Sequence, residues 1–178
     1  MTVFEEYLSD ALNAFKQHPN ARLVYANADF IGNKSGQWNL KEYKFQDLLF
    51  GNMIHCSAMF KRKDYDQTLG YKNNMLFGLE DWDYWLSLLD QNSEVIHLPQ
   101  ILFHYRIKFN SRTILLNKDR KKKYKKMKLQ IYINNLEKYD SPINVMMLIN
   151  IAYFLSKQLY QIKKNVRNIP RIFKQKFF

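Results

Sequence analysis

The order of hydrophobic patterns over residues 1–111 restricts the chain to few folds. Runs with helical spacing of apolar residues alternate there with strand-like runs, in the order 3–16, 21–32, 45–52, 53–62, 80–92, 94–99 and 100–107. Helices that alternate with strands along a chain pack as layers against a shared sheet. We therefore expect an α/β fold in which a mixed sheet is flanked by helices.

Charge divides the chain into two parts. Residues 1–111 contain 11 Lys and Arg against 13 Asp and Glu, whereas residues 112–178 contain 17 against 3. The formal net charge of +12 therefore belongs to the second part. We predict a globular domain over 1–111 and a basic helical appendage over 112–178, and any anionic partner should bind the appendage.

Composition excludes several classes of protein. With 178 residues, 47% of them apolar, the chain can bury a core and is not typical of a disordered protein. A single cysteine, Cys56, rules out a disulfide within the chain and a cysteine-rich zinc fold, and we expect it to be a small buried residue. Residues 1–15 are acidic and amphipathic, without the basic start of a signal peptide, so we expect a cytoplasmic protein.

Three carboxylates open the helix expected at 80–92. The stretch GLEDWDYW places Glu80, Asp81 and Asp83 in its first turn, where unpaired backbone N–H groups and the helix dipole stabilise negative charge. Acidic residues are ordinary features of a helix start, and solvated carboxylates would explain the stretch without any chemistry. The other interpretation is a site in which the helix start fixes one carboxylate as a catalytic base.

The segments around this helix favour the catalytic interpretation. The succession LVYANADFIG, FQDLLFGNMIHCSAMFKR, GLEDWDYWLSLL and LFHYRI resembles the latter half of a family 2, GT-A type glycosyltransferase. Members share the form G-x-E-D-x-D/E-x-W at a helix start, which is matched here by Gly78, Glu80, Asp81, Asp83 and Trp85. The resemblance implies inverting transfer of a sugar from a nucleotide-sugar donor to a hydroxyl of a glycan or lipid-linked acceptor, in bacterial surface polysaccharide or lipopolysaccharide synthesis.

The resemblance also implies roles for individual residues. It assigns the general base to Asp81, because a sugar hydroxyl is a poor nucleophile until a carboxylate takes its proton, and it places Glu80 beside the acceptor. Further candidates for substrate binding are Trp82, Asp83, Asn52, Trp38, Arg106 and His104. Of these, Trp82 could equally be a core residue and Arg106 a surface residue at a strand end. Trp85 is expected in the core.

Family members bind a divalent cation, Mg²⁺ or Mn²⁺, through a D-x-D motif, and this cofactor is expected for the complete enzyme. Asp81 and Asp83 match the string, but the family's motif follows a buried strand, whereas this string lies in a helix start. Asp29 lies alone on a strand, and one carboxylate is a weak ligand set for these ions. The four histidines lack metal-ligand spacing, and we expect His55 and His97 to be packing or surface residues. We therefore predict no complete metal site.

The beginning of the chain resembles the part that follows the metal motif in the family. The nucleotide pocket and the D-x-D motif would precede it, and neither is found in the sequence. We therefore expect a truncated glycosyltransferase, an acceptor-side half whose activity would depend on a donor-binding half. The alternative is a non-catalytic fragment that binds a membrane or a partner.

The appendage has the composition of a segment that lies on a membrane surface. Ile162, Val166, Ile169 and Phe173 recur every three to four positions among Lys and Arg, which favours binding to an anionic membrane surface. The protein would then be peripheral on the inner face of the plasma membrane. The basic run at 120–128 would suit nucleic acid, but no nucleic-acid-binding module is recognisable, so no nucleic acid is expected. A solvated or partner-docking helix is the third interpretation.

Overall fold

A computed structural model of the chain provides the structure. It describes residues 2–3, 5–38, 40–108, 119–139, 152–153, 156–157 and 159–160. The chain divides into two compact units, Met1–Lys138 and Tyr139–Phe178. All elements that form the candidate site belong to the first unit.

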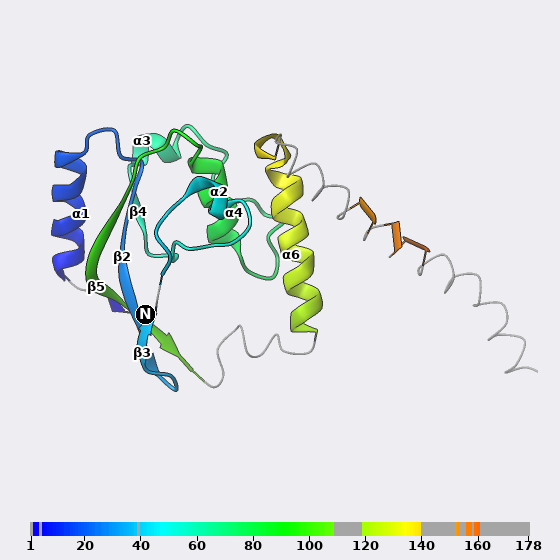
Figure 1. Cartoon of the computed structure of the whole chain (residues 1–178), viewed down its shortest axis with the longest axis horizontal. Helices are drawn as coiled ribbons and strands as arrows, with labels where there is room; N and C mark the ends of the chain where they lie inside the picture. The colour runs from blue at the N-terminus through cyan, green and yellow to red at the C-terminus, as the bar shows by residue number, and fades with distance from the viewer. Residues whose placement is uncertain are drawn as a thin grey trace, which may run out of the picture. The chain divides into compact units, whose positions relative to one another are not determined.

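The first unit is built on a five-stranded mixed sheet (Figure 1). At its centre β2 (Leu23–Gly32) runs parallel to β5 (Val95–Ile107). The remaining strands pair antiparallel with one of these two: β1 (Thr2–Val3) with β5, and β3 (Gly36–Trp38) and β4 (Met59–Phe60) with β2. The predicted α/β class with a mixed sheet is confirmed.

Strand β5 is continuous across Pro99, although the sequence predicted two strands broken at that residue. The pairing with β2 shifts there, from Ala26 opposite Leu98 to Asn27 opposite Ile101. Pro99 therefore lies in a bulge, where no N–H group is required for the ladder. The Asn27 side-chain amide donates to the Pro99 carbonyl at 2.7 Å and stabilises the bulge.

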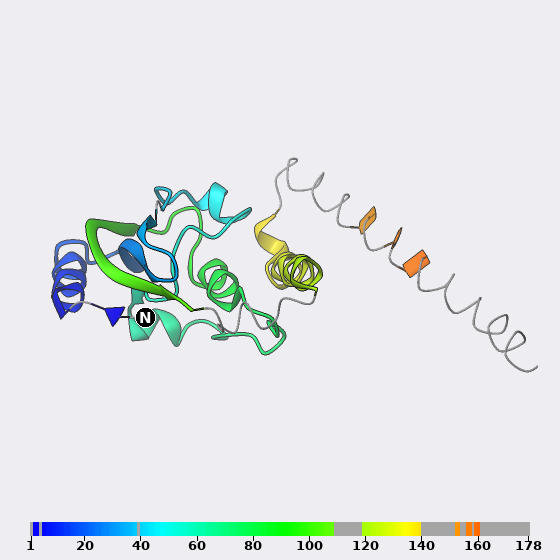
Figure 2. The ribbon, with the colours of Figure 1, turned by 90° about the horizontal axis from the view of Figure 1, so that it is seen from below.

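Helix α1 (Glu5–Gln17) covers one face of the sheet (Figures 1 and 2). Its inward residues are small or aromatic and pack against the central strands; this cluster comprises Tyr7, Ala11, Ala14, Val24, Ala26 and Leu102. The alanines bring the helix close to the strands, and the Tyr7 hydroxyl donates to the Val24 carbonyl at 3.5 Å. This face of the sheet is therefore covered by α1, and the candidate site lies on the other face.

Helix α4 (Glu80–Leu88) lies on the opposite side of the sheet, with the short helices α2 (Phe45–Leu48) and α3 (Arg62–Tyr65). Two fully buried indoles connect α4 to the loops around it. Trp82 Nε1 donates to the Leu48 carbonyl at 2.7 Å, and Trp85 Nε1 donates to the Ile54 carbonyl at 3.2 Å. The core position predicted for Trp85 is confirmed.

The run 53–62 was expected to form a strand, but only β4 at its end pairs with the sheet. Side chains take the place of ladder partners in the rest of the run. The Ile54 carbonyl accepts from Trp85, and the Ile54 N–H donates to Asn52 Oδ1 at 3.1 Å. The segment is therefore a loop that crosses the α4 side of the sheet, and it contributes to the candidate site.

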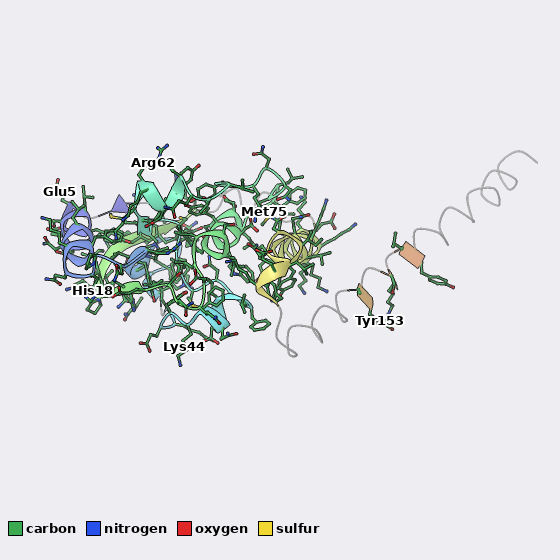
Figure 3. The ribbon with its side chains drawn as sticks, turned by 90° about the horizontal axis from the view of Figure 1, so that it is seen from above. Glu5, His18, Lys44, Arg62, Met75 and Tyr153 are labelled. Atoms are coloured by element: carbon green, nitrogen blue, oxygen red, sulfur yellow. The ribbon has the colours of Figure 1, made fainter. Side chains whose placement is uncertain are left out.

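Helix α6 (Arg120–Asn134) and the 3₁₀ turn η1 (Leu136–Lys138) complete the first unit. Met127 and Ile131 are buried on the side that faces α4, and Met75 lies beside α6 (Figure 3). The compact unit therefore includes α6, beyond the boundary that the charge pattern placed at residue 111, because one side of this basic helix is apolar.

Asp83 fastens α6 to α4. Its carboxylate is 1% exposed and accepts hydrogen bonds from the side-chain amides of Asn134 at 3.0 Å and Asn135 at 2.9 Å. The Lys72 ammonium lies 3.7 Å from its other oxygen. Asp83 is thus a buried anion with three donors around it, and its surroundings give it a structural role.

The second unit is described at Tyr139, which is buried, and at 152–153, 156–157 and 159–160, which are helical. Tyr153, Leu159 and Tyr160 are exposed there. The amphipathic pattern from Ile162 to Phe173 lies outside the described residues. In the part of the chain that is described, no helix has both the length and the apolar character required to cross a bilayer.

Candidate functional site

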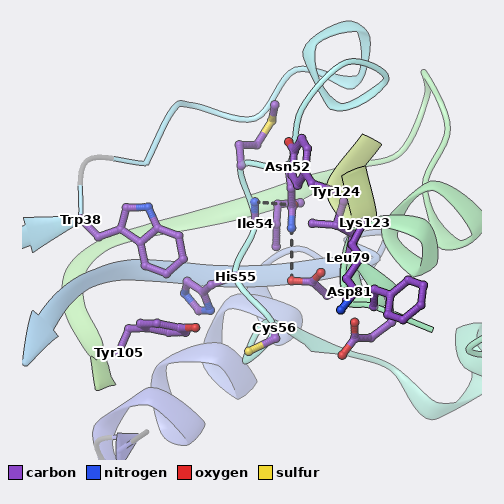
Figure 4. A pocket seen from close by; sticks show the side chains of 14 residues that line it. Trp38, Asn52, Ile54, His55, Cys56, Leu79, Asp81, Tyr105, Lys123 and Tyr124 are labelled. Carbon is purple, nitrogen blue, oxygen red and sulfur yellow. Dashed lines mark hydrogen bonds between the residues drawn. The ribbon is translucent and has the colours of Figure 1, made fainter. Parts of the chain in front are cut away.

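A cavity of about 410 Å³ opens beside the N-terminal end of α4 (Figure 4). Its lining comes from β3, two connecting segments, the start of α4, β5 and the first two turns of α6, namely Trp38, 52–56, 77–81, Tyr105, Lys123 and Tyr124. A neighbouring hollow of about 400 Å³ shares Trp38, Asn52 and Met53 with it. Cavities of a few hundred cubic ångströms are typical binding sites for small molecules.

Asp81 lies at the wall formed by the start of α4. Its Oδ1 accepts a hydrogen bond from the Trp82 backbone N–H at 2.8 Å, and its Oδ2 accepts one from the Asn52 amide at 3.2 Å. Burial raises the pKa of this carboxyl, the negative charge of Glu80 raises it further, and the two hydrogen bonds oppose the change. The group is therefore fixed in orientation and is a stronger base than an exposed aspartate.

A left-handed turn presents Asp81 to the cavity. Gly78 and Leu79 precede α4 with φ angles of 104° and 65°. A left-handed backbone is accessible to glycine, but at a residue such as leucine it costs roughly 1–2 kcal/mol. The Leu79 carbonyl nevertheless accepts the first helical bond from the Asp83 N–H at 3.1 Å. The backbone is therefore strained next to the carboxylate, and such strain is common at functional sites.

Aromatic rings form the other end of the cavity (Figure 4). Trp38 and Tyr105 meet edge to face, with ring centroids 5.5 Å apart, and the His55 ring lies 6.4 Å from Trp38. Their faces and edges offer apolar area with polar atoms at the rim. Such a wall suits the C–H face of a sugar ring, and in Figure 4 Asn52 lies above Asp81, to which its hydrogen bond is drawn as a dashed line.

His55 holds this wall in place. The ring is 2% exposed, stacks on Phe103 at 4.6 Å, and bonds the Ala26 carbonyl through Nε2 at 2.9 Å. The Ser57 hydroxyl lies 2.7 Å from Nδ1, where it can donate. Burial lowers the pKa of His55 to about 4, against the hydrogen bond to Ala26. The imidazole is therefore neutral near pH 7 and supports the wall without acting as an acid there.

Cys56 lines the cavity and is exposed, whereas the sequence predicted a buried residue. The difference arises because residues 53–58 form a loop instead of a strand. Partial burial and the neighbouring charge of Asp81 raise the pKa of the thiol. Cys56 is therefore a thiol at neutral pH and, as the single cysteine, a convenient reporter of what occupies the cavity.

The structure brings some of the predicted substrate-binding residues together and separates others. Asn52, Trp38 and Glu80 line the cavity with Asp81. Trp82 and Asp83 are 1% exposed in the interior and do not line it. Their positions follow from helix geometry, because residues one and two places after Asp81 point to other sides of α4.

Arg106 and His104 also lie away from the cavity lining. His104 pairs across the parallel strands with Asp29, and its Nδ1 contacts the Asp29 carboxylate. Arg106 is exposed on β5. Asp29 thus has a structural partner on the neighbouring strand.

The divalent cation that the family resemblance implies requires several oxygen ligands. Among the described residues, no three His, Cys, Asp or Glu side chains converge on a point that could hold a metal. The carboxylates of Glu80 and Asp81 are only two. The described part of the chain therefore does not fit this ion, and no step is assigned to a metal here.

Sequence reasoning missed Lys123 and Tyr124, which reach the cavity from α6. A signal for Lys123 was present, because Lys123, Met127 and Ile131 are spaced by four residues and share one side of the helix. The buried positions of Met127 and Ile131 then fix where that side points. Comparisons with models of protein families and with curated proteins gave no match to this chain.

Proposed function

We propose that the chain forms the acceptor side of a GT-A-like, inverting glycosyltransferase, with Asp81 as the general base. The observation that supports this most is the Asp81 carboxylate, which lines a cavity of about 410 Å³, is fixed by Trp82 and Asn52, and has a raised pKa. The combination of a fixed, basic carboxylate and an aromatic wall suits a sugar hydroxyl.

The proposed reaction is a single displacement. An acceptor hydroxyl bonded to Asp81 attacks the anomeric carbon of the donor sugar, the new bond forms from the hydroxyl oxygen, and the bond to the nucleoside diphosphate breaks. The proton passes to Asp81, and the leaving diphosphate carries away the electron pair. Attack from the side opposite the leaving group inverts the anomeric centre. Asn52 would hold the carboxylate in line, and Trp38 would support the acceptor ring.

The proposal concerns the acceptor side because the described residues contain no recognisable site for the nucleotide-sugar or its metal. The donor would be bound by groups outside that part of the chain. A cytoplasmic place on an anionic membrane surface agrees with the positive charge of residues 112–178 and with a lipid-linked acceptor.

A reconstituted transfer assay tests this function. Extracts from producing cells that lack the chain would supply every other component, with labelled nucleotide-sugars and Mg²⁺ or Mn²⁺ present. We expect purified wild-type chain to restore transfer and Asp81→Asn to lower it by about 10²–10⁴-fold, as for a general base. The matched control is Asp66→Asn, an exposed carboxylate that pairs with Arg62.

Transfer that survives in Asp81→Asn would overturn the assigned base. An extract that transfers equally without the chain would overturn the enzymatic function. If saccharides then still bound in the cavity, the alternative of a non-catalytic binding module would replace it.

A further inference from the structure

Two lysine ammoniums lie near one aromatic ring of the cavity lining. Lys123 Nζ lies 5.4 Å and Lys126 Nζ 5.7 Å from the centroid of Phe77. Phe77 and Lys123 both line the cavity that contains Asp81. Cation–π contacts of this length are modest, but they hold both positive charges close to Phe77, although Lys126 itself is exposed and is not part of the lining.

These charges lack a neutralising carboxylate. No salt bridge joins Lys123 or Lys126 to an acidic side chain among the described residues. The sequence from 109 to 134 contains one acidic residue, Asp119. Lys123, which lines the cavity, and Lys126, which is exposed three residues further along α6, therefore carry positive charge that no acidic side chain in the described part of the chain pairs with.

The position of the lysines on α6 is also unfavourable without an anion. Basic residues crowd the N-terminal half of the helix: Arg120, Lys121, Lys122, Lys123, Lys125, Lys126 and Lys128. Cations at a helix N-terminus oppose its dipole, and like charges four residues apart repel each other. A bound dianion would relieve both effects, and phosphate is the anion that lysine ammoniums commonly bind.

The cavity thus has two poles. The carboxylates of Glu80 and Asp81 lie at the start of α4, and the ammoniums lie on α6. A neutral sugar would use only the first pole. A ligand with a hydroxyl at one end and a phosphate at the other would use both.

We propose that the cavity binds a phosphorylated saccharide, whose phosphate lies between Lys123 and Lys126 over Phe77 and whose hydroxyl faces Asp81. That this ligand is the acceptor of the transfer rests on the proposed function. That the cavity binds it does not depend on that function. The site would then select acceptors that carry a phosphate close to the sugar that is extended.

Cys56 provides the test, because it lines the same cavity and is the only thiol. The rate of its alkylation by iodoacetamide in the full chain would be measured at constant ionic strength with glucose 1-phosphate, galactose 1-phosphate, the two parent sugars, inorganic phosphate, and vesicles of phosphatidylglycerol or phosphatidylcholine. We expect the sugar phosphates to protect the thiol at concentrations at least about tenfold below those of the parent sugars, since charge-assisted bonds are worth this factor or more.

Matched variants on one helix localise the effect. Lys123→Gln with Lys126→Gln should raise the half-protecting concentration by about tenfold or more. Lys121→Gln with Lys125→Gln removes the same charge from exposed positions outside the cavity lining and should change it less than about twofold. Circular dichroism of each variant verifies that α6 remains folded.

Equal protection by parent sugars and sugar phosphates would overturn the proposal, as would equal losses in the two double variants. Protection by phosphatidylglycerol vesicles alone would overturn it in favour of a lipid headgroup. Protection by sugar phosphates in a chain that fails to restore transfer supports this site and overturns only the enzymatic function. Restored transfer without such protection supports the enzymatic function and overturns the site for a phosphorylated saccharide.

Discussion

Asp81 and Asp83 stand two residues apart in the string DWD, yet their replacement should have different effects on stability. Asp83 is 1% exposed and accepts from Asn134 and Asn135, whereas Asp81 borders a cavity with a raised pKa. Removal of the Asp83 carboxylate should destabilise the first unit strongly. Removal of the Asp81 charge should not.

The magnitude follows from the contacts of Asp83. Hydrogen bonds to a charged group contribute roughly 1.5–3 kcal/mol each, and a buried donor left unpaired costs roughly 1–3 kcal/mol. Asp83→Ala loses two such bonds and leaves one N–H of the buried Asn135 amide without its acceptor, while the bond from this amide to the Ile131 carbonyl remains, so we expect the free energy of unfolding to fall by about 4 kcal/mol. Asp83→Asn keeps an acceptor for both amides and loses only the contact with Lys72, for a loss of about 1–2 kcal/mol.

The charge of Asp81 has the opposite effect on the free energy of unfolding. Because burial raises the folded-state pKa of this acid, the ionised group disfavours folding at pH values above its unfolded-state pKa, and the effect is complete above the folded-state pKa. Asp81→Asn removes that penalty and loses the bond from Asn52, so the free energy of unfolding at pH 7 should stay within about 1 kcal/mol of the wild type.

Urea unfolding at pH 7, followed by tryptophan fluorescence, measures all three variants, since Trp82 and Trp85 are buried beside both aspartates. The predicted order of stability is Asp81→Asn close to wild type, then Asp83→Asn, then Asp83→Ala. A loss for Asp83→Ala below about 1 kcal/mol would refute the role of this residue in fastening α6. A loss for Asp81→Asn equal to that of Asp83→Ala would refute the division of roles.

Two further predictions concern the wall and the turn of the site. Because the pKa of His55 is lowered to about 4 from 6.5, the unfolded chain binds a proton at this residue before the folded chain does as the pH falls. The difference in free energy of unfolding between wild type and His55→Gln should therefore decrease by about 3 kcal/mol as pH falls from about 6.5 to about 4. A difference that stays constant over this range in urea titrations would contradict the buried neutral ring. Gly78→Ala at a φ of 104° should destabilise by about 1–2 kcal/mol, whereas Gly51→Ala, with open space around it and no positive φ, should change the midpoint of thermal unfolding little; similar shifts for both would show that the turn is not strained.

Local patterns predicted the elements whose partners are close in sequence or whose periodicity is strong. The structure has α1 at Glu5–Gln17, β2 at Leu23–Gly32 and α4 at Glu80–Leu88, near the predicted runs. The structure differs from the prediction where groups distant in the sequence determine the local conformation. The loop at 53–58 is held by bonds to Trp85 and to the Ala26 carbonyl, and β5 crosses Pro99 because Asn27 stabilises the bulge.

The candidate site was predictable in part for the same reason. Asp81 and Glu80 stand out in a helix start, and helix geometry alone could have separated Asp83 from Asp81, since two residues correspond to a rotation of roughly 200°. His55, Tyr105 and Lys123 join Asp81 only through the fold, from positions far apart in the sequence. No local pattern contains that information, apart from the four-residue spacing that connects Lys123 to the buried side of α6.

The central claim is that Asp81 takes the proton of an acceptor hydroxyl, and the pH dependence of transfer in the reconstituted assay tests it most directly. Wild-type chain should show a rate that rises with pH through one ionisation above the ordinary aspartate pKa of 3.8, and Asp81→Asn should lose this ionisation together with about 10²–10⁴-fold in kcat, with little change in the acceptor KM. Asp81→Glu should keep the ionisation at a reduced rate. An Asp81→Asn variant that retains both the rate and the pH profile of the wild type would contradict the account.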